Sequence, residues 1–279
     1  MSMPFYISPE QTMRDKADYA RKGVARSRSS VALQYADGIL LVTPNVSSVL
    51  HKISEIYDRI AFAAVGRYNE SEVLRKAGVT YADVTGYQFD RGDVTARGLA
   101  NWYAQALGTN FSEPAGKPYE VEIVVAEVGL KPDGDQIYRI SWDGSVSDEP
   151  GFVAFGGQAD QVTTALKERF SDGMSLTEAL GAALAALAAP AAASGSSPAS
   201  NGAQLELTAA NLEVAILDRA RAHRTFRRLA GTRLEELIAE SRATEAIEPT
   251  ETAEAADEPA PPSDEPPTGP SSAGDGIPK

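Results

Sequence analysis

The order of strand-like and helical segments in this 279-residue chain predicts an α+β fold, a four-layer αββα sandwich of two stacked, mostly antiparallel sheets flanked by helix pairs. Groups of strand-like runs alternate with pairs of helical segments, and long hairpins favour antiparallel pairing. Several of the strand-like runs are almost wholly apolar, which requires cover on both faces of a sheet. Two stacked sheets with helix pairs outside satisfy both conditions.

The chain is expected to open with a helix. Ser8, Pro9 and Gln11 form a capping-box pattern, and Pro9 suits the first helical position. Gly23 is a suitable residue to end this helix. Apolar residues recur on one face at helical spacing: Met13, Ala17, Ala20 and Val24. Because this stripe is narrow and the other faces are polar, we expect the helix to lie on a larger body.

Three strands are predicted next. Residues 31–35 alternate in polarity and residues 39–43 are apolar, and the Asp37-Gly38 turn signal between them predicts a β-hairpin. Residues 60–65 (IAFAAV) are almost wholly apolar and are followed by Gly66. This pattern is typical of a strand that is covered on both faces.

The rest of the chain repeats the pattern of helix pairs and strands. Asn69 with Glu72 forms a cap pattern for one helix, and Asp93 is placed to open a second. A loop rich in Ser, Gly, Pro and Ala is expected at 190–202. Further strands are expected at 119–129, 136–144, 151–157 and 211–218, and further helices at 158–170, 175–189 and 225–240.

The composition argues against several kinds of chemistry. The chain has no cysteine, so it has no disulfide, thiolate nucleophile or Cys-ligated metal. Its two histidines do not form a metal site at any typical spacing, and we expect neither a metal nor another cofactor. The formal net charge of −13, without a basic stripe, argues against nucleic acid as a partner.

The sequence also predicts a cytoplasmic location. The first residues, MSMPFYISPEQ, lack the basic stretch and apolar core of a secretory signal. The most apolar run, 179–193, contains Pro190 and is shorter than the roughly 20 residues that a membrane helix needs. We therefore expect no membrane partner.

Residues 241–279 are predicted to be a disordered tail. They contain nine acidic and two basic residues, eight prolines and no aromatic residue. Such a segment cannot bury enough apolar surface to offset the entropy that is lost on ordering. The expected organisation is therefore a short N-terminal segment (1–7), one folded domain (8–240) and this acidic tail.

Two short patterns allow both a catalytic and a structural interpretation. His51 stands near Ser47 and Ser48 and could act as a general base, but no carboxylate is placed by spacing to orient it, which favours a surface loop. Gly156 and Gly157 precede a helix and could hold a phosphate, but the P-loop and dinucleotide fingerprints are missing, which favours a tight turn.

Longer segments resemble one known family. The α-type subunits of the proteasome core particle, in their actinobacterial branch, are similar to this chain in five runs: SPEQ…DYARKGVARSRSSVALQYADGILLV, HKISEIYDRIAFAAVGRYNE, GYQFDRGDVTARGLANWYAQAL, YRISWDGSVSDEPGFVAFGG and LEVAILDR. The resemblance covers residues 5–240. It implies the N-terminal-nucleophile hydrolase-like fold, which is the sandwich already inferred from the order of strands and helices.

The resemblance implies a subunit without catalytic residues. In the related β-type subunits the nucleophile is a freed N-terminal threonine. Alignment on the Asp37-Gly38 turn places Arg28 at that position, with Ser29 and Ser30 after it. Arginine cannot be this nucleophile, and the upstream helix leaves no free amine. The endopeptidase activity of such a complex therefore belongs to its β partner.

The family also implies an assembly with a gate. Identical α chains form heptameric rings on the β subunits, and their first residues, here 1–7 with Phe5 and Tyr6, close an axial pore. Pro9 and Tyr19 match family positions that shape the turn where this gate segment lifts. Unfolded protein substrates pass through the open pore.

Lys52 matches the family lysine of an activator-docking pocket between neighbouring α chains. There the C-terminal carboxylate of an AAA ATPase docks through a charge-assisted contact. Ser27, Gly66 and Arg67 match other pocket positions. In the actinobacterial branch, the family implies degradation of proteins that carry a small ubiquitin-like modifier of the Pup type. Without the resemblance, Lys52 would be interpreted as an ordinary exposed lysine.

Two other functions remain open at this point. The chain could be an active N-terminal-nucleophile hydrolase that uses Ser29 or Ser30 after processing, or a general binding module whose acidic tail recruits partners. The residue at which the purified chain begins tests the first alternative, and deletion of residues 242–279 tests the second.

Overall fold

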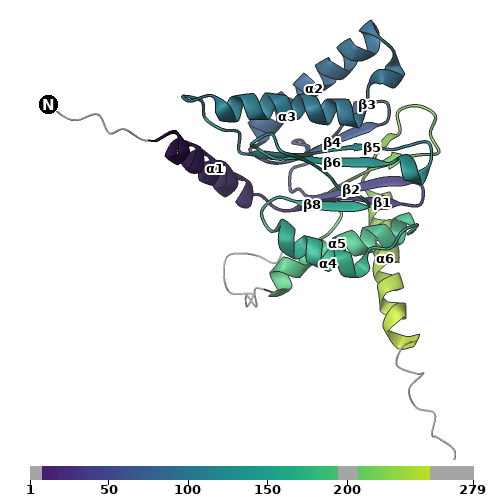
Figure 1. Cartoon of the computed structure of the whole chain (residues 1–279). Helices are drawn as coiled ribbons and strands as arrows, with labels where there is room; N and C mark the ends of the chain where they lie inside the picture. The colour runs from purple at the N-terminus through teal and green to yellow at the C-terminus, as the bar shows by residue number, and fades with distance from the viewer. Residues whose placement is uncertain (1–7, 194–206, 252–279) are drawn as a thin grey trace, which may run out of the picture.

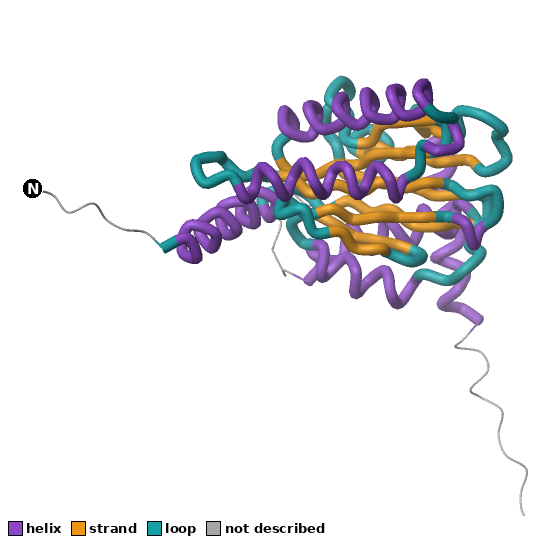
Figure 2. Tube along the Cα trace, turned by 45° about the horizontal axis from the view of Figure 1, so that its top comes forward, coloured by secondary structure: helices purple, strands orange, loops and turns teal. Residues whose placement is uncertain are grey.

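Two stacked sheets with helices on both outer faces form the body of the molecule (Figure 1). The computed structural model describes residues 8–193 and 207–251. Figure 2 shows both sheets between helices from a second side. Each sheet has five strands, and all neighbouring strands are antiparallel. This arrangement confirms the predicted αββα sandwich.

The first sheet contains the predicted hairpin. Its strand order is β10-β9-β2-β1-β8. The two strands of the hairpin pair around the Asp37-Gly38 turn, with Tyr35 opposite Gly38. The strand bounds are β1 (Ser30–Tyr35), β2 (Gly38–Pro44), β8 (Phe152–Phe155), β9 (Leu212–Asp218) and β10 (Phe226–Leu229).

The second sheet has the order β3-β4-β5-β6-β7. Two of its strands, β3 and β7, were not expected from the sequence. Both are short edge strands, and neither contains the long apolar run by which strands were predicted. All three residues of β7 are exposed. The strand bounds are β3 (Ile53–Tyr57), β4 (Ile60–Gly66), β5 (Val121–Glu127), β6 (Gln136–Ile140) and β7 (Val146–Asp148).

Three apolar layers stabilise the sandwich. One lies between the sheets, a second lies between the first sheet and α4, α5 and α6, and the third lies between the second sheet and α2 and α3. Burial of each large side chain in these layers contributes about 1.5–3 kcal/mol. The helix bounds are α2 (Tyr68–Gln88), α3 (Ala96–Ser112), α4 (Ala159–Arg169), α5 (Leu176–Ala193) and α6 (Thr232–Glu251).

Helix α1 (Pro9–Ala25) extends from one end of the sandwich and packs against β4 and β5 (Figure 1). Its start is as predicted, because the Ser8 hydroxyl accepts the Gln11 backbone N–H at 3.2 Å. The helix does not end at Gly23 but continues to Ala25. Gly23 is needed for close packing instead, since a Cβ there would lie 2.4 Å from Glu120 Oε2.

Two predicted helix starts are wrong. Asn69 is not a cap, because it lies inside α2, which begins at Tyr68 with Arg67 at the N-cap. Asp93 does not open α3. It lies in a short 3-10 turn, and Thr95 caps α3 by accepting the Gly98 N–H at 3.1 Å. In both places a neighbouring residue occupies the cap, which spacing alone does not reveal.

The predicted helix at 225–240 is replaced by strand β10 and helix α6. Phe226 pairs with Leu217 of β9, and Gly231, at φ +57°, separates the strand from the helix. Helix α6 continues past residue 240, where we expected the domain to end, and Ser241 is 2 % exposed. The remainder of the predicted tail, like residues 1–7, lies outside the described residues.

Candidate functional site

The position aligned with a catalytic threonine lies between α1 and β1. Arg28 occupies it and remains joined to α1. The Ser30 hydroxyl lies 2.6 Å from that of Thr43, and Ser30 is 2 % exposed. The Ser29 hydroxyl accepts the backbone N–H of Gln158 at 3.0 Å and is also buried. Both serines are therefore held in the fold rather than presented to a substrate.

Lys52 immediately precedes β3, and its side chain turns back to β2. Its ammonium group donates to the Pro44 carbonyl oxygen at 3.1 Å, and its own carbonyl accepts the Ala64 N–H at 3.1 Å. Burial lowers the pKa of Lys52 and the charge of Arg28 lowers it further, whereas Glu213 acts in the opposite direction. Among the described residues, no carboxylate forms an ion pair with the ammonium group, which leaves this cation able to bind an anion.

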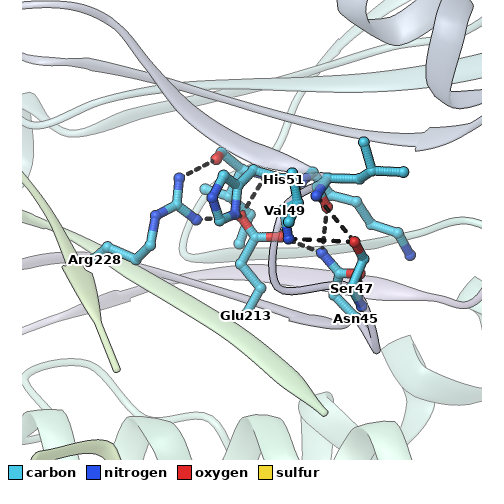
Figure 3. Close-up of polar contacts among 9 residues, drawn as sticks. Asn45, Ser47, Val49, His51, Glu213 and Arg228 are labelled. Atoms are coloured by element: carbon cyan, nitrogen blue, oxygen red, sulfur yellow. Dashed lines mark hydrogen bonds and ion pairs between the residues drawn. The ribbon is translucent and has the colours of Figure 1, made fainter. Parts of the chain in front are cut away.

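The loop before Lys52 is fixed to β9 by the carboxylate of Glu213 (Figure 3). This carboxylate accepts the backbone N–H groups of Lys52 at 2.9 Å and Ile53 at 3.2 Å, and the side-chain amide of Asn45 at 2.8 Å. Arg228 on β10 pairs with the same carboxylate and donates to the Ile53 carbonyl oxygen at 2.9 Å. Since Glu213 is 6 % exposed, this network sets the position from which Lys52 projects.

The same loop carries His51 and an exposed apolar surface. His51 Nδ1 lies 3.4 Å from Glu213 Oε1, and its side chain is 42 % exposed, which agrees with the surface-loop interpretation. The Ser47 hydroxyl accepts the Leu50 N–H at 3.0 Å and so takes part in the local structure of the loop (Figure 3). The exposed apolar side chains of the loop are Val46, Val49 and Leu50.

Gly66 and Arg67 lie where β4 passes into α2. Gly66 has φ +106°, and a Cβ there would lie 2.0 Å from the Glu120 carbonyl oxygen, so only glycine fits without strain. The Arg67 N–H donates to that oxygen at 3.0 Å, and its side-chain Nε lies 2.9 Å from the Glu120 carboxylate. The Arg67 side chain is half-exposed, so it remains accessible from outside.

The structure brings the predicted docking residues to one end of the sandwich without direct bonds between them. Antiparallel pairing of β3 and β4 places Lys52 at the same end of that hairpin as Gly66 and Arg67. Ser27 follows α1, and its hydroxyl donates to the Val24 carbonyl oxygen at 2.6 Å. The Ser27 hydroxyl thus bonds to the last turn of α1.

The predicted gate residues divide between described and undescribed parts of the chain. Pro9 occupies the first turn of α1, and Tyr19 lies further along the helix with 46 % of its surface exposed. Lys117 lies over the Tyr19 ring, 5.7 Å from its centroid. Phe5 and Tyr6 fall outside the described residues.

Two backbone N–H groups at the Gly156-Gly157 turn already have acceptors within the protein. The Gly156 N–H donates to Glu122 at 2.8 Å, and the Gln158 N–H donates to Ser29. This favours the tight-turn interpretation.

Across residues 8–193 and 207–251, no group of three His, Cys, Asp or Glu side chains could hold a metal ion. No helix in those ranges is long and apolar enough to span a bilayer.

Two carboxylates of this region were missed by the sequence analysis. Glu213 and Glu120 lie in or beside apolar strands, in the runs LEVAILD and YEVEIVV. An acidic residue in such a run is a usable signal, because a buried charge requires a partner. Its partner cannot be named from sequence, since the contacts join distant segments.

Comparison with known proteins gives consistent matches. A family model described as "Proteasome subunit" matches residues 24–204. The chain is 65% identical over 240 residues to the proteasome subunit alpha of Thermomonospora curvata, covering 86% of this chain and 99% of that one. It is 60% identical to that of Thermobifida fusca (86% and 92% covered). It is 55% identical to that of a Nocardioides species over 271 residues (97% and 99% covered).

Proposed function

Since this chain belongs to the family of proteasome α subunits, we propose that it is a non-catalytic gating subunit of a proteasome core particle. In this proposal, identical chains form a heptameric outer ring on β subunits that carry the proteolytic activity. Residues 1–7 of each chain lie at the pore and control the passage of unfolded proteins. The proposed setting is the cytoplasm.

The non-catalytic role is supported by residues 28–30, at the junction of α1 and β1. A nucleophile of this kind needs a free terminal amine beside its hydroxyl. Arg28 stands at the aligned position and is preceded by the whole of α1. Ser29 and Ser30, the two residues that the rival hydrolase function would use, are buried and hydrogen-bonded. These features favour a non-catalytic gating subunit rather than an active hydrolase.

The docking role is supported by the charge and position of Lys52. Its ammonium group contacts a neutral carbonyl, so its charge can still attract the C-terminal carboxylate of an AAA ATPase. Arg67, at the same end of the β3–β4 hairpin, supplies a second accessible cation. We propose that such an ATPase delivers substrates with a Pup-type tag, which rests on the family resemblance.

A single substitution tests the docking role. In complexes of the full chain with its β partner, Lys52→Ala should leave assembly intact and abolish the stimulation of protein degradation by the ATPase. Lys167→Ala, an exposed lysine of α4 in the other helix layer, is the matched control and should behave as wild type. Unchanged ATPase-dependent degradation by Lys52→Ala would remove the docking role.

The two rival functions are tested separately. Intact mass spectrometry of the purified chain should show an N-terminus near Met1, whereas cleavage directly before Ser29 or Ser30 would support the hydrolase. Truncation after Glu251, which keeps the whole of α6, should leave rings and degradation intact. Loss of degradation on that truncation would support a binding module that acts through its acidic tail.

A further inference from the structure

A buried carboxylate lies between α1 and the start of α2. Glu120 is 4 % exposed, and its Oε1 lies 2.9 Å from both Arg67 Nε and Lys117 Nζ. Lys117 in turn covers the ring of Tyr19 on α1. One anion therefore connects a proposed docking residue, Arg67, with a proposed gate residue, Tyr19.

The packing around this carboxylate leaves little freedom. A Cβ at Gly23 of α1 would lie 2.6 Å from both Cβ and Cγ of Glu120, so the helix backbone rests directly on this side chain. The Glu120 backbone N–H donates to Glu70 of α2 at 2.7 Å, and its carbonyl oxygen accepts from Arg67. Main chain and side chain of Glu120 thus contact α1 and α2 at once.

The groups around Glu120 favour its charged form. Burial opposes ionisation, but the neighbouring Lys117 and Tyr19 side chains, together with the charge of Arg67, bring the pKa of Glu120 below its ordinary value. A buried carboxylate that loses one cationic partner leaves a charge that must be compensated elsewhere. Any group that draws Arg67 away therefore changes the forces on the remaining partners.

We infer that Glu120 couples the activator-docking end of the sandwich to α1. A carboxylate that binds the half-exposed Arg67 competes with Glu120 for the guanidinium group. Glu120 then depends more on Lys117 and Tyr19, which shifts the preferred position of α1. This inference rests on the proposed docking and gating function, and it makes Glu120 a positioning residue.

The first test separates binding from opening. In complexes with the β partner, the degradation of a long unstructured quenched peptide is measured against the concentration of the AAA ATPase from the same organism. Glu120→Gln keeps the shape but removes the charge. It should lower maximal stimulation by about five-fold or more, while the half-maximal ATPase concentration changes by less than about two-fold. If the fall in maximal stimulation is matched by an equal fold-change in the half-maximal ATPase concentration, the inference is wrong.

Glu72→Gln is the matched control. Glu72 also pairs with an arginine, Arg75, with Nε and Oε2 2.8 Å apart, but both residues lie within α2. It does not link α1 to α2, so Glu72→Gln should keep wild-type stimulation. If Glu120→Gln behaves like Glu72→Gln while Lys52→Ala abolishes stimulation, the coupling is wrong and the docking function stands. If Lys52→Ala has no effect, the docking function itself fails.

A double-mutant cycle gives a readout that a merely structural role would not move. Tyr19→Phe and Arg67→Lys alter two residues that do not bond to each other. Their effects on maximal stimulation should be non-additive by about five-fold in the wild-type chain. In the Glu120→Gln background the same pair should become additive. Persistent non-additivity without the Glu120 charge would show that another route joins the two residues.

Discussion

The carboxylate of Glu213 on β9 accepts the backbone N–H of Lys52 at 2.9 Å, although 161 residues separate them along the chain. The same carboxylate binds Asn45 at the other end of the β2–β3 loop. Both ends of the loop are thus fixed to the first sheet, and Lys52 is held at one end of the second. A buried carboxylate in β9 thereby determines where a proposed docking cation stands.

Substitution of Glu213 should destabilise the fold as well as the loop. Glu213→Ala removes the acceptor of two backbone N–H groups and of the Asn45 amide, and it breaks the ion pair with Arg228, so we expect the free energy of unfolding to fall by about 3 kcal/mol. Urea unfolding of the full chain measures this. Glu236→Ala, which removes an exposed carboxylate of α6, should change it by less than about 0.5 kcal/mol. Equal midpoints for the two variants would contradict the structural role of Glu213.

Gly66 should tolerate alanine less well than another glycine with positive φ. Gly66→Ala adds a methyl group that would lie 2.0 Å from a backbone oxygen, whereas Gly173, at φ +79°, has no atom within 4 Å of its would-be Cβ. Gly173→Ala should cost about 1 kcal/mol from backbone strain alone, and Gly66→Ala about 2 kcal/mol more. Thermal unfolding of both variants measures the difference, and similar melting temperatures would count against the close contact at Gly66.

The sequence predicted the architecture well because long apolar runs and turn residues define β1, β2, β4 and β5. It missed β3, β7 and β10, whose short runs contain Ser, Glu, Asp or Arg and are stabilised mainly by pairing with a neighbour. Phe226–Leu229 was expected to belong to the helix predicted at 225–240. Pairing with β9 decides its structure, and that contact is invisible locally.

The candidate site was predictable only in part. The docking role of Lys52, Gly66 and Arg67 is a prediction that rests on resemblance, since no local pattern distinguishes such a lysine from an ordinary one. Glu213 and Glu120, which hold these residues in place, were not found. Their partners come from segments distant in sequence, so their role depends on the register between sheets and helices.

Removal of the Ser30 hydroxyl should affect stability but not proteolysis. Ser30→Ala leaves the buried Thr43 hydroxyl without the partner that lies 2.6 Å away, and we expect a loss of about 1 kcal/mol in unfolding free energy. Peptide hydrolysis by the complex with the β partner should stay at the wild-type rate. The double variant Ser30→Ala with Thr43→Val should recover part of the stability. Loss of hydrolysis in the single variant would revive the hydrolase interpretation.

Glu72 should make the stability of the chain depend on pH in the acid range. The hydrogen bond from Arg75 is the main cause that lowers the pKa of Glu72 from 4.5 to about 2 in the folded chain, while burial opposes it. A carboxylate with a depressed folded pKa stabilises the fold above its unfolded pKa, and this stabilisation is lost as pH falls toward the folded value.

The comparison of wild type with Glu72→Gln isolates this contribution, because all other carboxylates are common to both chains. At pH 6 the variant should be less stable by about 1 kcal/mol, as expected for a partly exposed ion pair. The difference should shrink steadily as pH falls from 5 to 3, because protonation then weakens the wild-type pair while glutamine does not titrate. Urea unfolding at each pH measures the difference. A gap that stays constant over this range would show that Glu72 has no depressed pKa in the folded chain.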